Sequence, residues 1–238
     1  MKKLFFKTLM LFLTMNLFAQ NIPEWIFPLR DAVYEQRLNA NQIKQIYTDA
    51  QNTSKERLSG TALDIALSRC EYFMGRALLF EERNQEAKLH FEEGLRLAEN
   101  AVNAAPSSQA WVMRAENLSF LCQINPLSFA MANGLNIERF AKNALRFDER
   151  NAAAQYMIAA RWVYAPAPLH NHNKGIEMMK AIITNGDMQK DDRFNVYSAI
   201  GYAYLQRKNI SEATLWLQRS LEIYPTNKFV TGLINNIK

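Results

Sequence analysis

Apolar and small residues recur at helical spacing along most of this 238-residue chain. One stretch carries Ala87, Phe91, Gly94, Ala98 and Ala101 in steps of four, three, four and three. Such steps align side chains along one face of an α-helix, and small residues there allow another helix to pack closely. The pattern predicts a series of amphipathic helices separated by short polar turns.

Residues 194–227 contain the clearest helix–turn–helix unit. Two apolar stretches flank a polar turn at 206–209. Gly201 and Ala213 are small enough for the two helices to approach each other. Pro225 is expected to end the second helix, because proline cannot continue the hydrogen-bond ladder.

A second copy of this unit lies at residues 68–101. Its packing positions Gly75 and Ala87 are 12 residues apart, the same spacing as in the first unit. In both copies an Asn, at Asn84 and Asn209, is expected to cap the second helix. Two such copies favour a repeat architecture.

The unit at 194–227 resembles the tetratricopeptide repeat, a 34-residue helix–turn–helix module, because its packing positions carry that family's residues or close substitutes. Two weaker units lie between the copies. The equivalent small residues of the four units are Gly75, Ala115, Ala159 and Gly201, spaced by 40, 44 and 42 residues. The resemblance implies an all-α solenoid of about four helix–turn–helix pairs, stretched by longer helices or turns.

This interpretation divides the chain into a signal peptide (1–19), N-terminal capping helices (20–60) and a helical repeat domain (61–238). The expected repeats cover 68–105, 108–148, 151–186 and 194–227, and 228–238 form a C-terminal cap. Two insertions interrupt them. Residues 124–134 are apolar with turn residues, and residues 164–173 contain two Ala-Pro steps that end a helix.

The first 19 residues, MKKLFFKTLMLFLTMNLFA, have the layout of a secretory signal peptide. Lysines open it, an apolar run follows, and the small Ala19 precedes the expected cleavage site. The run is shorter than the roughly 20 apolar residues of a membrane span. The first Cys is Cys70, so a lipoprotein anchor is not expected. We predict a periplasmic or secreted protein with no transmembrane span after cleavage.

Charge and cysteine content narrow the range of partners. The signal segment holds three Lys and no acidic residue, so the rest of the chain has 25 basic and 23 acidic residues, a net charge of +2. Without a dense Lys/Arg run, nucleic-acid binding is not expected. Export would expose Cys70 and Cys122 to an oxidising compartment. Whether they pair, or remain buried thiols, is left open.

The sequence offers little catalytic chemistry. Its three histidines are His90, His170 and His172, and no metalloprotease, P-loop or dinucleotide motif is present. His170 and His172 alone are too few ligands for a metal site. His90 is expected on a solvated helix face. We predict a protein without enzymatic activity, cofactor or metal.

Binding is better supported than catalysis. In the tetratricopeptide family the first helices of successive repeats line a concave groove, and the resemblance implies the same arrangement here. The inward positions, taken by register, are Arg69, Tyr72, Arg76, Phe80, Gln109, Glu116, Phe120, Tyr156, Tyr164, Asn195, Tyr202 and Gln206. Tyr and Arg are enriched at binding hot spots. The alternative is that several of these side chains pack one repeat against the next.

Two functional hypotheses follow. One is a scaffold that binds a protein or peptide partner of the cell envelope in its concave groove. The other is a carrier or transporter-associated protein for a small hydrophobic or carboxylated ligand. A closed pocket roofed by residues 124–134, with walls from Phe80, Phe120 and Tyr156, would favour the carrier. An open groove would favour the scaffold.

The stretched repeats and the export signal also resemble, in part, the T component of TRAP transporters. That resemblance implies a transporter component as the partner. The segment at 161–179 resembles the proline-containing turn of that group. It lacks the Gly-Gly-Asp usual there, and the lipoprotein cysteine is also missing.

The signal peptide gives the first testable prediction. Export should be followed by cleavage after Ala19, so the mature chain should begin at Gln20. Intact-mass analysis and amino-terminal sequencing of the exported protein check this. An exported chain that still begins at Met1 would contradict it.

Overall fold

The computed structural model describes residues 22–237, so the predicted signal peptide lies outside the described residues. A short 3₁₀ turn, η1 (Glu24–Ile26), precedes eleven α-helices in this part of the chain. They are α2 (Phe27–Glu35), α3 (Ala40–Arg57), α4 (Gly60–Leu79), α5 (Asn84–Ala104), α6 (Ser108–Ile124), α7 (Leu127–Phe147), α8 (Ala152–Tyr164), α9 (His172–Asn185), α10 (Lys190–Gln206), α11 (Ile210–Leu221) and α12 (Lys228–Asn235). Residues 22–237 contain no strand, only an isolated bridge between Asn151 and Asp187.

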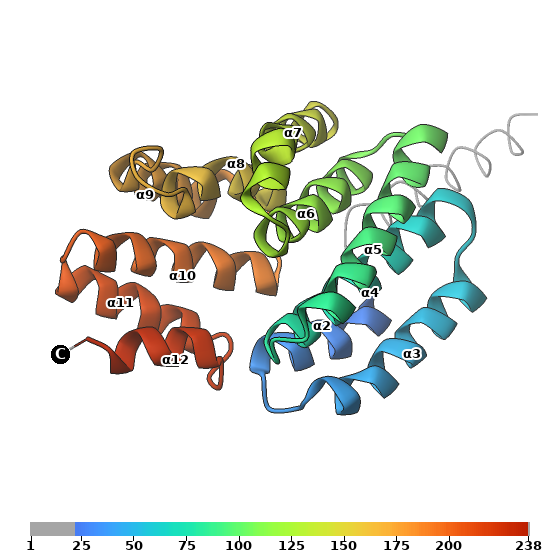
Figure 1. Ribbon diagram of the computed structural model, residues 1–238, viewed down its shortest axis with the longest axis horizontal. Helices are drawn as coiled ribbons and strands as arrows, with labels where there is room; N and C mark the ends of the chain where they lie inside the picture. Colours follow the sequence, from blue (N-terminus) through green and yellow to red (C-terminus); the bar gives the residue numbers. More distant parts are fainter. Residues whose placement is uncertain (1–21, 238) are drawn as a thin grey trace, which may run out of the picture.

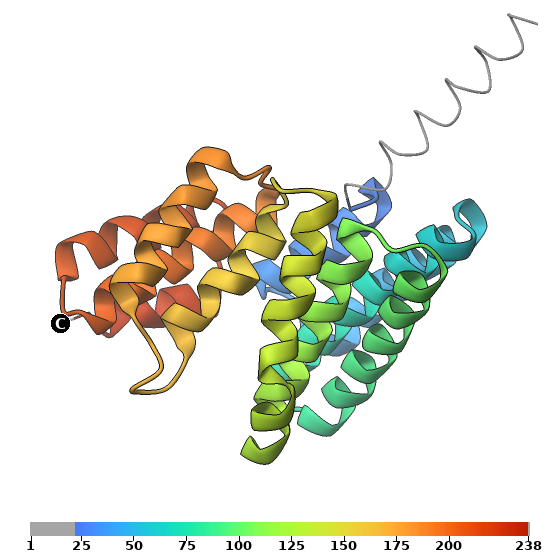
Figure 2. The same ribbon diagram turned by 90° about the horizontal axis from the view of Figure 1, so that it is seen from above.

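The helices form four successive hairpins, α4–α5, α6–α7, α8–α9 and α10–α11 (Figures 1 and 2). The first helices α4, α6, α8 and α10 contact one another in series and form an inner row. The second helices pack mainly on the first helices of their own and the following hairpin. The prediction of an all-α solenoid of four helix pairs is confirmed for the described residues.

The first and last hairpins share their packing in detail. A Cβ at Gly75 would lie 2.7 Å from the ring of Phe91, and a Cβ at Gly201 would lie 2.7 Å from the Leu217 side chain. Both contacts join residues 16 apart. In each turn the residue seven positions after the glycine is left-handed, Glu82 with φ 60° and Lys208 with φ 59°. The two hairpins are therefore copies of one local structure.

Helix lengths explain the stretched spacing. Helix α5 has 21 residues, and α4 begins at Gly60, eight residues before the expected start of the first repeat. Its early turns pack Ile65 against Ala101 and Val102 near the end of α5. Likewise α10 begins at Lys190 rather than at residue 194. Asn209 caps α11 as predicted, whereas Asn84 lies inside α5 and Arg83 holds its N-cap position.

Only one of the two expected insertions is a loop. Residues 165–171 connect α8 to α9, as the Ala-Pro steps indicate. Residues 127–134, by contrast, belong to α7, which begins directly after Pro126 at its N-cap position. Proline is well tolerated at a helix start, where its missing N–H costs no hydrogen bond. Leu127, Met131 and Leu135 are exposed along α7.

His90 is not a solvated surface residue as expected. Its Nδ1 lies 2.6 Å from Oε2 of Glu71, and Tyr47 donates a hydrogen bond to the other carboxylate oxygen. The three residues come from α5, α4 and α3. This polar contact fastens α3 to the first hairpin.

Helix α2 does more than cap one end of the stack. It packs against α4 (Figure 1). Its Asp31 side chain also accepts a hydrogen bond from Tyr224, in the segment before α12. The ring of Tyr34 stacks on Tyr224 at 4.9 Å and meets Phe194 edge-on at 5.3 Å. Asn227 donates a hydrogen bond to the Tyr34 carbonyl oxygen. Helix α2 therefore joins the first hairpin to the last.

Neither cysteine forms a disulfide. Cys70 is buried in α4, and Cys122 is half-buried in α6. Burial raises the pKa of the Cys70 thiol well above its ordinary value. Within residues 22–237, none of the helices combines the length and hydropathy that crossing a membrane requires.

The glycine contacts predict the effect of substitution. Gly201→Leu should reduce the free energy of unfolding by about 1–3 kcal/mol, because the new side chain must displace Leu217. The matched control is Gly134→Leu in α7, where a Cβ meets nothing within 4 Å. That control should be neutral or stabilising, because Leu favours helix over Gly by about 0.8–1 kcal/mol. Urea unfolding of both variants measures the difference, and equal effects would contradict this packing.

Candidate functional site

The inner row of first helices carries the candidate binding surface, here called the inner face. The early residues Gln109 of α6, Ala152 of α8 and Asp191 of α10 line one small cavity. The late residues Tyr164 of α8 and Tyr202 of α10 meet at a ring distance of 5.2 Å. The inner face therefore has one end at the helix starts and another at the helix ends.

The end at the helix starts is polar and closed. Arg69 Nη1 lies 2.8 Å from Glu116 Oε2, and the two side chains are only 7% and 10% exposed. Arg69 also donates a hydrogen bond of 3.1 Å to Gln109. Burial raises the pKa of the Glu116 carboxyl, although the positive charge of Arg69 acts in the opposite direction. Arg69 is thus engaged with protein partners and is not a free anion site.

Arg76 sits further along α4 in an aromatic cage. Its guanidinium carbon lies 4.3 Å from the ring centroid of Tyr34, 5.5 Å from Tyr72, 5.6 Å from Phe120 and 5.9 Å from Phe80. Nη1 donates to the Tyr72 hydroxyl at 3.3 Å. Nε is buried without a hydrogen-bond partner. In residues 22–237 no carboxylate forms an ion pair with Arg76, so its contacts are aromatic rings and a tyrosine hydroxyl.

The end at the helix ends is aromatic and open. We call it the aromatic rim and define it by Phe80, Tyr156, Tyr164 and Tyr202. Phe80 is 46% exposed and Tyr164 is 42% exposed. Burial raises the pKa of Tyr156, and the neighbouring Tyr164 hydroxyl acts in the opposite direction. Exposed aromatic rings beside a cation are a typical composition for a binding hot spot.

The structure places the twelve predicted inward residues on or directly after the inner-row helices. Their exposed fractions differ with their position along these helices. Arg69, Tyr72 and Glu116 are buried; Arg76, Gln109, Phe120, Tyr156, Asn195 and Tyr202 are half-buried; Phe80, Tyr164 and Gln206 are exposed. Their role as ligand contacts stays a prediction.

Asn195 is occupied by the protein itself. Its side-chain amide donates a hydrogen bond of 2.9 Å to the hydroxyl of Tyr34. Tyr34 is fully buried, and this burial raises its pKa well above the ordinary value. Helix α2 thus covers the inner face between α4 and α10. Sequence reasoning missed this contact because Tyr34 and Asn195 are 161 positions apart and no local pattern links them.

The described residues offer no cluster of three or more His, Cys, Asp or Glu side chains arranged to hold a metal ion. His170 and His172 stack on each other at 4.3 Å. Burial and the neighbouring His170 lower the pKa of His172. The chemistry of the inner face is therefore that of ion pairs, hydrogen bonds and aromatic contacts.

Comparison with known proteins gives limited information. No protein-family model matches the chain, and no curated protein matches it. Among solved structures, it is similar to YrrB, described as a TPR protein with an unusual peptide-binding site. The two are 14% identical, with 90% of this chain and 91% of YrrB covered, and the TM-score is 0.38. The tetratricopeptide resemblance therefore rests on the repeats described above.

Proposed function

We propose that this protein is a non-enzymatic, exported scaffold that binds a protein or peptide partner of the cell envelope on its inner face. The observation that carries the proposal is Arg76. This partly buried cation lacks a carboxylate partner in the described chain and lies 5.9 Å from the ring of Phe80 in the aromatic rim. A partner carboxylate at Arg76, with apolar side chains on Phe80 and Tyr164, satisfies both features.

The rim suits an extended polypeptide for two reasons. It involves three inner-row helices, since Phe80 directly follows α4 and the three tyrosines lie on α8 and α10. Its rings are amphipathic or apolar and lose little conformational entropy on binding, which is why aromatic residues concentrate at protein interfaces. Arg76 sets the orientation of the bound polypeptide, because charge-assisted hydrogen bonds to a carboxylate require a defined geometry.

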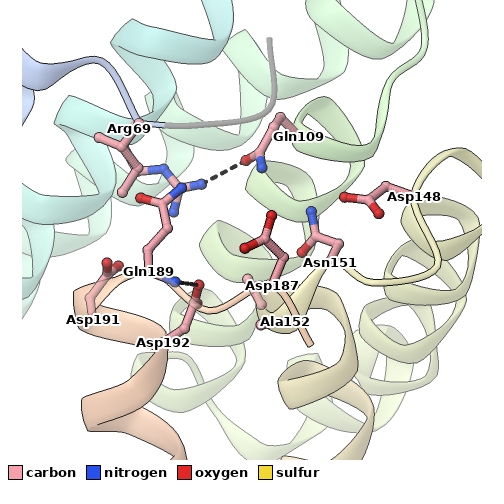
Figure 3. A pocket seen from close by; sticks show the side chains of 11 residues that line it. Arg69, Gln109, Asp148, Asn151, Ala152, Asp187, Gln189, Asp191 and Asp192 are labelled. Carbon is pink, nitrogen blue, oxygen red and sulfur yellow. Dashed lines mark hydrogen bonds between the residues drawn. The ribbon is translucent and has the colours of Figure 1, made fainter. Parts of the chain in front are cut away.

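The carrier alternative has less support in this structure. The cavity at the helix starts measures about 30 Å³ and is lined mainly by polar residues (Figure 3), with no contribution from Phe80, Phe120 or Tyr156. Residues 124–134 were expected to roof the carrier pocket, but 127–134 are the first turns of α7 and expose Leu127 and Met131. A transporter component remains one candidate class of polypeptide partner within the scaffold proposal.

The test is capture of a partner from the envelope fraction of the native host. Tyr164→Ala and Arg76→Gln should each lose the polypeptide that the wild-type protein retains. Tyr164→Ala should change the melting temperature little, because Tyr164 is 42% exposed. The matched control is Leu89→Ala on the outer helix α5, an exposed apolar residue away from the inner face, which should retain the polypeptide.

Native mass spectrometry of the same preparations identifies what is bound. A retained polypeptide whose capture depends on Tyr164 and Arg76 supports the scaffold. Unchanged capture by both variants would overturn the proposed surface. A retained small molecule in place of a polypeptide would favour the carrier.

A further inference from the structure

The outer face of α7 carries one row of exposed side chains from its first turn to its last. The residues follow one another in steps of four, four, four, three and four, so each lies about one turn beyond the previous one. We call this row the α7 ridge; it consists of Leu127, Met131, Leu135, Arg139, Lys142 and Arg146. All six are exposed, and the proposed function uses none of them.

The first half of the α7 ridge is apolar. Leu127 is 73% exposed, Met131 77% and Leu135 76%. Single exposed apolar residues are common on protein surfaces, whereas a contiguous patch of them marks an interaction site. The chain contains no charged residue between Glu116 and Glu138, so the patch has only neutral neighbours within its own helix. Figure 2 shows the start of α7 at the lower edge of the molecule.

The second half of the α7 ridge is cationic. Glu138 is the only carboxylate of α7, and it pairs with Lys142 at 2.8 Å and with Arg161 of α8. These two cations hold the pKa of the Glu138 carboxyl below its ordinary value. Arg139 lies over the ring of Phe140 at 5.4 Å. Within residues 22–237 no carboxylate forms an ion pair with Arg139 or Arg146, so both guanidinium groups are available to an anion.

The charge of the helix as a whole agrees with this division. Residues 127–147 contain three cations and one carboxylate, a net charge of +2, and all four charges lie in the second half. Asp148 and Glu149 follow the helix, and Asp148 already accepts a hydrogen bond from the backbone N–H of Arg150. The ridge therefore matches a surface that is apolar in depth and anionic at its boundary.

A lipid bilayer is such a surface. Apolar side chains of a peripheral helix enter the boundary between headgroups and acyl chains, and basic side chains bind the anionic headgroups. Arg139 lies about 6 Å along the axis from Leu135, so its guanidinium can stay at the level of the phosphates while the start of α7 lies deeper.

The shape of the ridge also favours a bilayer over a second folded protein. A stable protein interface buries about 800 Å² on each partner and requires a complementary shape. The α7 ridge is a single row on the convex surface of one helix. A fluid bilayer adapts to such a row, because it has no fixed shape of its own.

We propose that the α7 ridge docks this protein onto a bilayer surface that contains anionic lipids. Leu127, Met131 and Leu135 insert between the headgroups, and Arg139 and Arg146 bind lipid phosphates. Because α7 belongs to the outer layer of helices, docking leaves the inner face free to bind its partner at the membrane surface.

The test is flotation of the chain with lipid vesicles. The wild-type protein and every variant begin at Gln20, so the apolar signal segment contributes nothing to binding. Wild type should float with vesicles of equal parts phosphatidylglycerol and phosphatidylcholine. Its partition coefficient should fall about tenfold on phosphatidylcholine alone, and by a similar factor in high salt, because both conditions remove the electrostatic attraction.

The apolar half is tested by Met131→Gln, which places a polar side chain of similar length in the headgroup boundary. The partition coefficient should fall about tenfold. The matched control is Leu89→Gln on the outer helix α5, where a 66% exposed leucine lies between Glu86 and Glu92. That control should bind like wild type. Both variants should melt at the wild-type temperature, because the replaced side chains are exposed.

The cationic half is tested by Arg139→Gln/Arg146→Gln. This variant should bind phosphatidylcholine vesicles as wild type does and lose most of the gain that phosphatidylglycerol provides. The matched control is Arg219→Gln/Lys228→Gln, which removes the same charge from exposed positions near the end of the chain. It should keep that gain, which separates a headgroup contact on α7 from a general effect of net charge.

Three results would overturn the proposal. Wild type does not float with the anionic vesicles, or the variant Leu127→Gln/Met131→Gln/Leu135→Gln floats as well as wild type. The third is a dimer in sedimentation equilibrium without lipid that Met131→Gln abolishes and Leu89→Gln retains, since the ridge would then bind a second copy of the chain. None of these results affects the inner-face proposal, which is judged on Tyr164 and Arg76.

Discussion

The insertion of Tyr34 between the first and last hairpins is the contact on which the rest of the structure depends. Its ring lies under Arg76 of α4, against Phe194 of α10 and on Tyr224 before α12, while its hydroxyl bonds to Asn195. Helical repeat stacks normally bury surface only between neighbours, so their two ends are independent. Here a short helix from the start of the chain ties both ends together and commits them to one folding unit.

The position of α2 between the first and last hairpins also determines which part of the inner face remains accessible to a partner. Two residues of α2 contact the start of α10: Arg30 lies near Asp191, and Tyr34 lies near Asn195. Helix α2 therefore packs along the early turns of α10. The ion pair of Arg69 and Glu116 is buried at that end. The later turns of the inner row are not covered, and they keep their aromatic side chains exposed. One fold therefore produces a sealed polar end and an open aromatic end.

Local spacing predicted much of the fold. The 12-residue interval after Gly75 and Gly201 identified two hairpins that share a close glycine contact and a left-handed turn residue. The register also predicted that Tyr72 and Phe120 lie on one face, and their rings are 5.6 Å apart. Asn125-Pro126 does connect α6 to α7, whereas Asn133-Gly134, also interpreted as turn residues, lies inside α7. The position of α2 could not be predicted, since the partners of Tyr34 lie far along the chain.

The most direct test of the closure is native-state hydrogen exchange in Tyr34→Ala, with Tyr197→Ala as the control. Tyr197 is also aromatic, but its ring contacts Trp216 inside the last hairpin. If α2 ties the ends together, Tyr34→Ala should accelerate amide exchange in both α4 and α11–α12, whereas Tyr197→Ala should accelerate it only around α10 and α11. Exchange that rises in α2 alone, with α4 and α12 as protected as in wild type, would contradict this account.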